Sequence, residues 1–85
     1  MKLIVYSSTW CRDCHVAKTW LKQHNIAYQE INIEQTPGAA DELIRHTGKR
    51  AVPHFVLDGQ WIQPYSPHSG FLYQEMAELF GVKPE

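Results

Sequence analysis

The chain has 85 residues, enough for one domain, and we expect a single domain over residues 1–85. Hydrophobic residues make up 44% of the chain and charged residues 20%, which is ordinary for a globular domain. The 8 Lys and Arg residues nearly balance the 9 Asp and Glu residues, for a net charge of -1. Without a basic field the chain is a poor ligand for nucleic acid or an anionic membrane, and we expect neither as a partner.

Apolar runs and cysteine content both argue against an exported or membrane-bound protein. The longest uninterrupted apolar run, Leu3–Tyr6, is far shorter than the roughly 20 residues of a membrane span and shorter than the apolar segment of a secretory signal. We therefore expect a cytoplasmic protein. The 2 cysteines are too few for a disulfide-stapled scaffold, so packing must stabilise the fold and both thiols are free for chemistry.

The first three predicted elements form a strand–helix–strand unit. Residues Lys2–Tyr6 are a short β-type run that ends at Ser7-Ser8-Thr9. Apolar positions at helical spacing predict a helix over Arg12–His24, with Asn25 as its stop. Strand alternation resumes over Tyr28–Ile33. Because a helix connects them, the two strands should be parallel with a right-handed crossover.

A second helix and a hairpin follow. Thr36 is predicted to cap the helix and Pro37 to occupy its first position, and Gly48 closes it. Two further strands are predicted over Pro53–Leu57 and Gln60–Ile62. The Asp-Gly pair between them is a strong signal for a tight hairpin turn.

The last part of the chain is predicted to be a loop and a helix. The segment Gln63–Ser69 contains two prolines and should be a loop, whereas Phe71–Phe80 is amphipathic and ends at Gly81. The order of elements is therefore β-α-β-α-β-β-α. This order predicts an α/β fold in which a four-stranded mixed sheet is covered by three helices.

The candidate reactive residues lie in Cys11-Arg12-Asp13-Cys14, at the junction of the first predicted strand and the first predicted helix. Two intervening residues at a helix start let both sulfurs come within bonding distance. Free N–H groups and the helix dipole favour an anion there, so the Cys11 thiolate should be stabilised and act as the nucleophile. Cys14 lies one turn further in and is placed to resolve a mixed disulfide. Arg12 should assist the thiolate and Asp13 should oppose it.

Other interpretations use the same residues. Cys11–Cys14 followed by His15 matches a haem-attachment pattern, with Met76 available as a second ligand, although covalent haem attachment normally requires export. Two thiolates and two histidines are able to bind zinc, although no two histidines have the tight spacing typical of such a site. The pair is also compatible with two inert, buried cysteines.

The sequence resembles the glutaredoxin family, a compact branch of the thioredoxin fold. The resemblance lies in Val5–Ser7, which leads into Trp10–Cys14, and in Thr47–Pro53, which is followed by Asp58-Gly59. Together these segments cover most of the chain. The resemblance implies a thioredoxin-like fold and a thiol–disulfide oxidoreductase.

The family segment at Thr47–Pro53 implies a cis peptide bond between Val52 and Pro53, and X-Pro bonds are where cis peptides cost least. The backbone of Val52 would then face outward beside Cys11 and pair with an extended peptide or with glutathione. Lys49 and Arg50 fall where the family binds glutathione carboxylates. The expected substrate- or glutathione-binding residues are Trp10, Arg12, Lys49, Arg50, Val52, Pro53, Ser69 and Gly70, with Trp10 as a partly exposed platform.

Some segments depart from the common glutaredoxin pattern. Ser7-Ser8 stands where many glutaredoxins have a lysine, and Ser69-Gly70-Phe71 replaces a Gly-Gly-x-Asp-type segment. The latter triplet resembles the NrdH-redoxin branch, which takes electrons from thioredoxin reductase and supplies ribonucleotide reductase. Asp13 and the segment Asn32-Ile33-Glu34 resemble mycoredoxin-like relatives, which use other low-molecular-weight thiols.

We therefore predict a monomeric thiol–disulfide oxidoreductase that reduces protein or mixed disulfides through Cys11 and Cys14. No tightly bound cofactor is expected. Glutathione or another low-molecular-weight thiol should serve as co-substrate, and disulfide-containing or thiolated proteins as partners. Two alternatives remain: an NrdH-redoxin-type electron donor reduced by the flavoprotein thioredoxin reductase, and a non-enzymatic metal- or iron–sulfur-binding module that uses the same cysteines.

Overall fold

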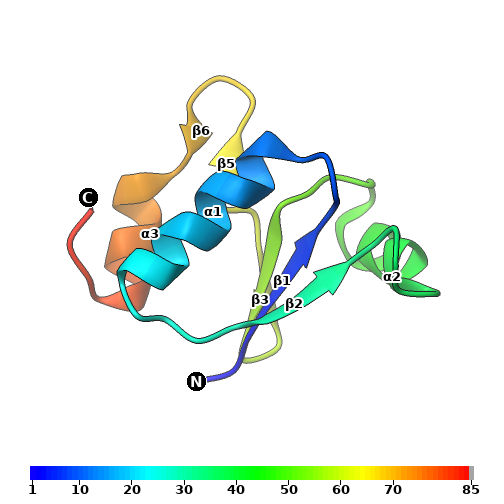
Figure 1. Cartoon of the computed structure of the whole chain (residues 1–85), viewed down its shortest axis with the longest axis horizontal. Coiled ribbons are helices and arrows are strands. Elements are labelled where there is room, and N and C mark those ends of the chain that lie inside the picture. The colour runs from blue at the N-terminus through cyan, green and yellow to red at the C-terminus, as the bar shows by residue number, and fades with distance from the viewer. Residues whose placement is uncertain (85) are drawn as a thin grey trace.

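The computed structural model describes residues 1–84. Four strands form the main sheet and three helices cover it (Figure 1). A further pair of very short strands lies between the fourth strand and the last helix. In chain order the elements are β1 (Leu3–Ser7), α1 (Arg12–Gln23), β2 (Gln29–Asn32), α2 (Ala39–Thr47), β3 (His54–Leu57), β4 (Gln60–Ile62), β5 (Tyr65–Ser66), β6 (Gly70–Phe71) and α3 (Tyr73–Phe80).

The main sheet has the strand order β2-β1-β3-β4. β1 pairs with β2 in parallel and with β3 in antiparallel orientation, so that Tyr6 lies between Ile31 and His54. β3 and β4 form the predicted hairpin through the Asp58-Gly59 turn. The four-stranded mixed sheet and three helices expected from the sequence are therefore confirmed, and the fold is thioredoxin-like.

Alternating side chains of β1 enter two cores on opposite faces of the sheet. Val5 packs with residues of α1 and α3, and its neighbour Tyr6 packs with residues of α2. This follows from the strand period of two residues, which points successive side chains to opposite faces. In the first core Trp20 is 1% exposed, its ring lies 5.3 Å from that of Phe71, and its indole nitrogen donates to the carbonyl oxygen of Pro84 at 3.3 Å.

None of the helices within residues 1–84 is long and apolar enough to cross a membrane.

The start of the second helix differs from the prediction. α2 begins at Ala39, and its N-cap is Gly38 with a φ of +81°, so Thr36 is not the cap and Pro37 is not the first helical residue. Thr36 instead belongs to a turn after β2. Its N–H donates to the Asn32 carbonyl at 3.0 Å, and its carbonyl accepts from the N–H of Ala39 at 3.1 Å. Because both backbone groups of Thr36 are hydrogen-bonded within this turn, the helix starts only after it.

The predicted loop Gln63–Ser69 also contains regular structure. Tyr65–Ser66 forms β5, which pairs with β6, and Phe71 belongs to β6 rather than to the last helix. The turn between the strands is held by the Ser66 hydroxyl, which accepts from the N–H groups of the two residues before Gly70, at 3.2 and 3.4 Å. The last helix therefore begins at Tyr73. Figure 1 shows this hairpin beside the start of α1.

Candidate active site

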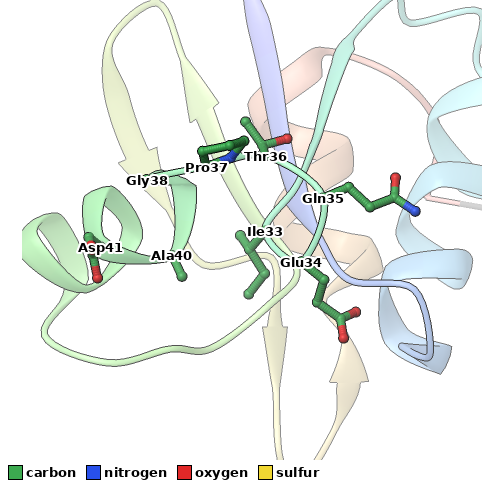
Figure 2. A pocket seen from close by; sticks show the side chains of 8 residues that line it. All are labelled: Ile33, Glu34, Gln35, Thr36, Pro37, Gly38, Ala40 and Asp41. Atoms are coloured by element: carbon green, nitrogen blue, oxygen red, sulfur yellow. The ribbon is translucent and has the colours of Figure 1, made fainter.

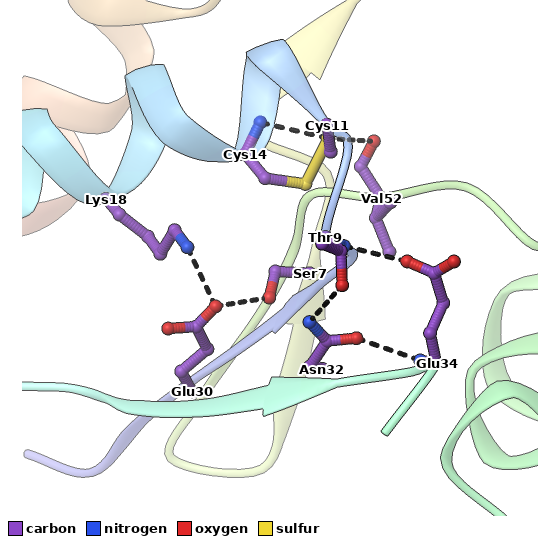
Figure 3. Close-up of a disulfide and its surroundings, with 9 residues drawn as sticks. All are labelled: Ser7, Thr9, Cys11, Cys14, Lys18, Glu30, Asn32, Glu34 and Val52. Atoms are coloured by element: carbon purple, nitrogen blue, oxygen red, sulfur yellow. Dashed lines mark hydrogen bonds and ion pairs between the residues drawn. A yellow bond between two sulfur atoms is a disulfide. The ribbon is translucent and has the colours of Figure 1, made fainter. Parts of the chain in front are cut away.

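Cys11 and Cys14 form a disulfide at the start of α1, with their Cα atoms 5.2 Å apart (Figure 3). Cys11 is the N-cap of the helix, in extended conformation with φ -117° and ψ 106°. Its sulfur accepts a hydrogen bond of 3.1 Å from the backbone N–H of Cys14. A free N–H at a helix start stabilises negative charge, so this contact favours a thiolate on Cys11 once the disulfide is reduced.

The two sulfurs differ in accessibility. Cys14 is fully buried, whereas Cys11 is half-buried. Of the two cysteines, Cys11 is therefore the one that solvent reaches. The neighbouring Trp10 is 93% exposed, more than the partly exposed platform expected from the sequence. Arg12 is exposed on the first turn of the helix.

The loop opposite Cys11 contains the cis peptide bond that the sequence predicts between Val52 and Pro53. Pro53 is fully buried. The carbonyl oxygen of Val52 lies 3.9 Å from the Cys11 sulfur (Figure 3). This arrangement sets the backbone of Val52 next to the Cys11 sulfur.

The loop that precedes Cys11 is tied to the end of β2. The backbone N–H of Thr9 donates to Glu34 Oε1 at 2.8 Å, and Asn32 Nδ2 donates to the Thr9 hydroxyl at 3.2 Å. Asn32 Oδ1 in turn accepts from the N–H of Glu34 at 2.9 Å (Figure 3). Sequence reasoning assigned no site role to Asn32 or Glu34. Their position after β2 was the available signal, because parallel strands end at the same edge of a sheet, where ligands commonly bind.

A second network lies beneath the disulfide and was also missed. The fully buried Ser7 donates through its hydroxyl to Glu30 Oε2 at 2.6 Å, and Lys18 Nζ donates to the same oxygen at 2.8 Å. These bonds, from Lys18 first and Ser7 second, lower the pKa of Glu30, with the positive charge of Lys18 adding to the effect. The network links α1, β1 and β2 one helical turn beyond Cys14.

The other expected binding residues fall in two places. Lys49 and Arg50 are exposed in the segment between α2 and the cis peptide. Ser69 is exposed at the tip of the β5–β6 hairpin, and Gly70 pairs with Ser66 within it. The structure therefore separates a basic pair on one side of the cis-proline loop from a serine–glycine pair on the hairpin.

Arg50 lines a hollow of about 160 Å³, which we call the charged hollow. Its lining residues are Ser8, Ile33, Glu34, Arg50 and Val52. A neighbouring hollow of about 240 Å³ is formed by Ile33–Gly38, Ala40 and Asp41 (Figure 2). Glu34 borders both hollows, and its side chain points away from Asp41 and α2 in Figure 2. The charged hollow is the one that adjoins Cys11, because it includes Val52.

The side chains required by the haem and zinc interpretations are not brought together. Met76 is 4% exposed and packs in the core under α1 and α3, where it cannot reach a haem attached at the outer end of α1. Within residues 1–84, no three His, Cys, Asp or Glu side chains form a group that could hold a metal ion.

A cysteine pair at a helix N-terminus, facing a cis-proline loop on this sheet, defines a thioredoxin-fold thiol–disulfide oxidoreductase. The chain belongs to the glutaredoxin family, whose sequence model matches residues 3–62. It is 37% identical over 75 residues to a glutaredoxin-like protein NrdH of Lactococcus lactis subsp. cremoris, covering 88% of this chain and 94% of that protein.

Solved structures agree with this assignment. The fold matches that of a variant of the thioredoxin-like protein BC3987 with a TM-score of 0.78 and 26% identity, covering 96% of this chain and 97% of the other. It also matches a buckwheat glutaredoxin in complex with glutathione, with a TM-score of 0.68 and 27% identity, covering 93% of this chain and 69% of the other. Members of this family exchange thiols and disulfides, and this chain is a thiol–disulfide oxidoreductase.

Proposed function

We propose that the protein reduces protein disulfides and mixed disulfides by dithiol exchange, with Cys11 as the nucleophile and Cys14 as the resolving thiol. The observation that carries this assignment is the unequal environment of the two sulfurs. Cys11 is half-buried and accepts the N–H of Cys14 at 3.1 Å, whereas Cys14 is fully buried. The first sulfur is therefore reachable and stabilised as an anion, and the second is protected from outside reagents.

The reaction follows two exchanges. The Cys11 thiolate attacks one sulfur of the substrate disulfide, a new bond forms to Cys11, and the other substrate sulfur leaves as a thiolate that takes up a proton. Cys14 then loses its proton and attacks the Cys11 sulfur. The second substrate thiol is released, and the Cys11–Cys14 disulfide remains. Two electrons pass from the protein to the substrate.

Substrate positioning is assigned to the residues around this pair. The Val52 carbonyl, 3.9 Å from the Cys11 sulfur, would pair with an extended substrate backbone. The buried Pro53 would hold the backbone of Val52 in place for this pairing. Trp10, 93% exposed, would contact the partner surface, and the exposed Arg12 would favour the thiolate.

For the return of electrons, we propose a low-molecular-weight thiol such as glutathione, acting on a monomer in the cytoplasm. Lys49 and Arg50 supply cations for its carboxylates, and a related fold binds glutathione in buckwheat glutaredoxin. Ser69 and Gly70 would contact the same thiol or a protein partner.

Thioredoxin reductase is the second candidate reductant. Similarity to the Lactococcus NrdH protein favours it, as does the Ser69-Gly70-Phe71 triplet, which stands at the hairpin beside α1. One experiment separates the two: oxidised protein is offered glutathione with its reductase, then thioredoxin reductase, each with NADPH, and the rates of NADPH oxidation are compared.

Variants of the two cysteines test the proposal itself. Cys11→Ser should abolish reduction of a neutral disulfide such as bis(2-hydroxyethyl) disulfide. Cys14→Ser should accumulate a mixed disulfide at Cys11, detected as added mass that dithiothreitol removes. A Cys11→Ser protein that reduces disulfides at the parent rate contradicts the proposal. Stoichiometric zinc or iron in freshly purified protein, together with poor reductase activity, would favour the metal-binding alternative instead.

A further inference from the structure

His54 is a buried titratable side chain that the proposed reaction does not use. It is the first residue of β3, is 5% exposed and lies opposite Tyr6 of β1. Its ring centroid is 5.9 Å from that of Trp61 on β4, and its Nδ1 has no hydrogen-bond partner within residues 1–84. A buried polar atom without a partner is costly, and a buried charge without one is costlier still. This site therefore accepts the neutral ring and disfavours the protonated one.

The groups that face His54 from β1 and α2 do not compensate a positive charge on its ring. Tyr6 is neutral at pH 7, because burial first and the charge of Glu42 second raise its pKa. Glu42 lies on α2, where one of its carboxylate oxygens accepts from Arg45 and the other contacts the His46 ring. This carboxylate is therefore already paired with two cationic or titratable side chains of its own helix.

Lys49, in the segment between α2 and β3, brings a positive charge close to His54. Burial first and this charge second lower the pKa of His54. The Trp61 ring also contacts His46, at 4.4 Å between ring centroids, but His46 is exposed and stays in contact with water when it is protonated. Of the two histidines that contact Trp61, His54 is therefore the one whose protonation places an unsolvated charge in the core.

The core that encloses His54 also supports the backbone beside the reactive sulfur. Val52 lies two residues before His54 and packs, like Trp61, against a core that includes residues of β1, α2 and β3. Pro53 between them is fully buried. The Val52 carbonyl is 3.9 Å from the Cys11 sulfur (Figure 3). Because a close-packed core does not open around one group alone, hydration of a charged His54 displaces Val52 as well.

We propose that His54 is a positioning residue whose neutral ring holds Val52 beside Cys11, and whose protonation in mild acid displaces Val52 and weakens the binding of peptide substrates. This assignment rests on the proposed function, in which the Val52 carbonyl pairs with an extended substrate backbone. A small disulfide without peptide groups makes no such pairing and does not sense His54. The protein therefore loses its preference for peptide disulfides as the pH falls.

The test compares two neutral disulfides in single-turnover reactions of the reduced full chain between pH 7.5 and pH 5.0. One is the disulfide of two acetyl-Ala-Cys-Ala-amide peptides, which offers backbone groups on both sides of the sulfur. The other is bis(2-hydroxyethyl) disulfide, which offers none. Samples are quenched by alkylation and the protein disulfide is quantified by mass. The ratio of the two second-order rate constants cancels the ionisation of Cys11, because both reactions use the same thiolate.

The ratio of peptide to small-disulfide rates should fall in the wild-type protein by about two- to tenfold from pH 7.5 to pH 5.0, as expected for the loss of one hydrogen bond. In His54→Phe, which keeps an aromatic ring that does not titrate, the ratio should not depend on pH. His46→Gln is the matched control, since it removes the exposed histidine on Trp61, and it should keep the wild-type fall. A constant wild-type ratio, or a fall that persists in His54→Phe or disappears in His46→Gln, would overturn the proposal.

Nuclear magnetic resonance of the oxidised wild-type protein gives a second measurement that does not depend on a variant. The Val52 amide signal should shift with the same pH midpoint as the His54 ring signals, and that midpoint should lie below 6.5. A His54 ring that stays neutral to pH 5.0, or a Val52 signal that is unchanged while the ring titrates, would overturn the positioning role and leave the oxidoreductase assignment intact. Failure of the reduced protein to react with either disulfide at pH 7.5 would instead contradict the proposed function.

Discussion

The hydroxyl of Ser7 and the ammonium group of Lys18 meet on one oxygen of Glu30, at 2.6 and 2.8 Å. Ser7 is fully buried at the end of β1, and Lys18 lies on α1 four residues after Cys14 (Figure 3). The single carboxylate of Glu30 therefore ties the helix that carries both sulfurs to two strands of the sheet.

Removing the carboxylate should destabilise the fold. We expect Glu30→Ala to lower the free energy of unfolding by about 1–3 kcal/mol, because the buried Ser7 hydroxyl loses its acceptor. Urea denaturation followed by circular dichroism measures the change. Ser7→Ala and the double variant complete a cycle, and the two single effects should not add, since both remove the same hydrogen bond. Strict additivity would show that the two residues act independently.

The same contact predicts a pH dependence. The pKa of Glu30 is lowered in the folded protein, first by the hydrogen bond from Lys18, so folding favours the ionised carboxylate. Its contribution to stability is present above the ordinary value of 4.5 and is lost as the pH falls through the lower folded value. Wild type and Glu30→Gln should therefore differ in urea midpoint at pH 7, and the difference should shrink as the pH falls below 4.5. A gap that widens toward acid would contradict this.

His54 should make the protein less stable in mild acid. Its side chain is 5% exposed, and its Nδ1 has no hydrogen-bond partner within residues 1–84. Its pKa is lowered from 6.5 by burial and then by the charge of Lys49. The folded protein thus disfavours the protonated ring. Stability from this residue is present above about pH 6.5 and declines as the pH falls toward the lower folded value, by at most about 1.4 kcal/mol per pH unit.

The His54→Phe variant tests this expectation. Its urea midpoint should fall less than that of wild type between pH 7.5 and pH 5.5, because phenylalanine does not titrate. His68→Gln is a matched control, since His68 is exposed in the turn of the β5–β6 hairpin, and it should keep the wild-type pH dependence. Identical pH profiles for His54→Phe and wild type would rule out His54 as the source.

Trp20 and Trp10 should respond to the same substitution in opposite ways. Trp20 is 1% exposed and packs against Phe71 and Phe80, so Trp20→Ala should lower the free energy of unfolding by about 3–5 kcal/mol. Trp10 is 93% exposed, so Trp10→Ala should change it by no more than about 0.5 kcal/mol. Trp10→Ala should nevertheless slow the reduction of a protein disulfide, measured with reduced protein. A large loss of stability in Trp10→Ala would show that its ring contributes to packing.

Gly70 should resist substitution because of its backbone conformation. Its φ is +71°, a left-handed value that side chains disfavour, although a Cβ there would meet no atom within 4 Å from the described residues other than its chain neighbours. We expect Gly70→Ala to cost about 1 kcal/mol through conformation alone. Thermal unfolding measures the loss, and Ser69→Ala next to it should have a smaller effect. Equal stability of Gly70→Ala and wild type would mean that the hairpin adjusts its backbone freely.

Local pattern was sufficient for most of the main sheet. The alternation in β2 and the helical spacing of apolar positions in α1 were predicted because burial of one face imposes a period that is visible in neighbouring residues. The β3–β4 hairpin was predicted because its Asp-Gly turn is a short-range signal. The cis peptide at Val52–Pro53 came from resemblance to a family, since local sequence permits either isomer.

The errors lie where backbone hydrogen bonds in a turn or a short hairpin override the preference of a single residue. Thr36 has the side chain of a helix cap, yet its backbone is engaged by Asn32 and Ala39, so the helix starts two residues later. Phe71 fits the helical stripe, yet pairing with Tyr65 makes it part of β6. Strand pairing depends on where the chain reverses direction. A helical or strand period in nearby residues does not determine where that reversal occurs.

The sequence alone determined the order of the main elements, the reactive cysteine pair and its place at a helix start, because each depends on residues close together in the chain. Only the tertiary structure decided that Glu34 and Arg50 share one hollow beside Cys11, and that Ser7, Lys18 and Glu30 share one hydrogen-bond network. These groups come from segments far apart in the chain. Their proximity is set by the packing of strands and helices, which brings the ends of parallel strands to one edge of the sheet.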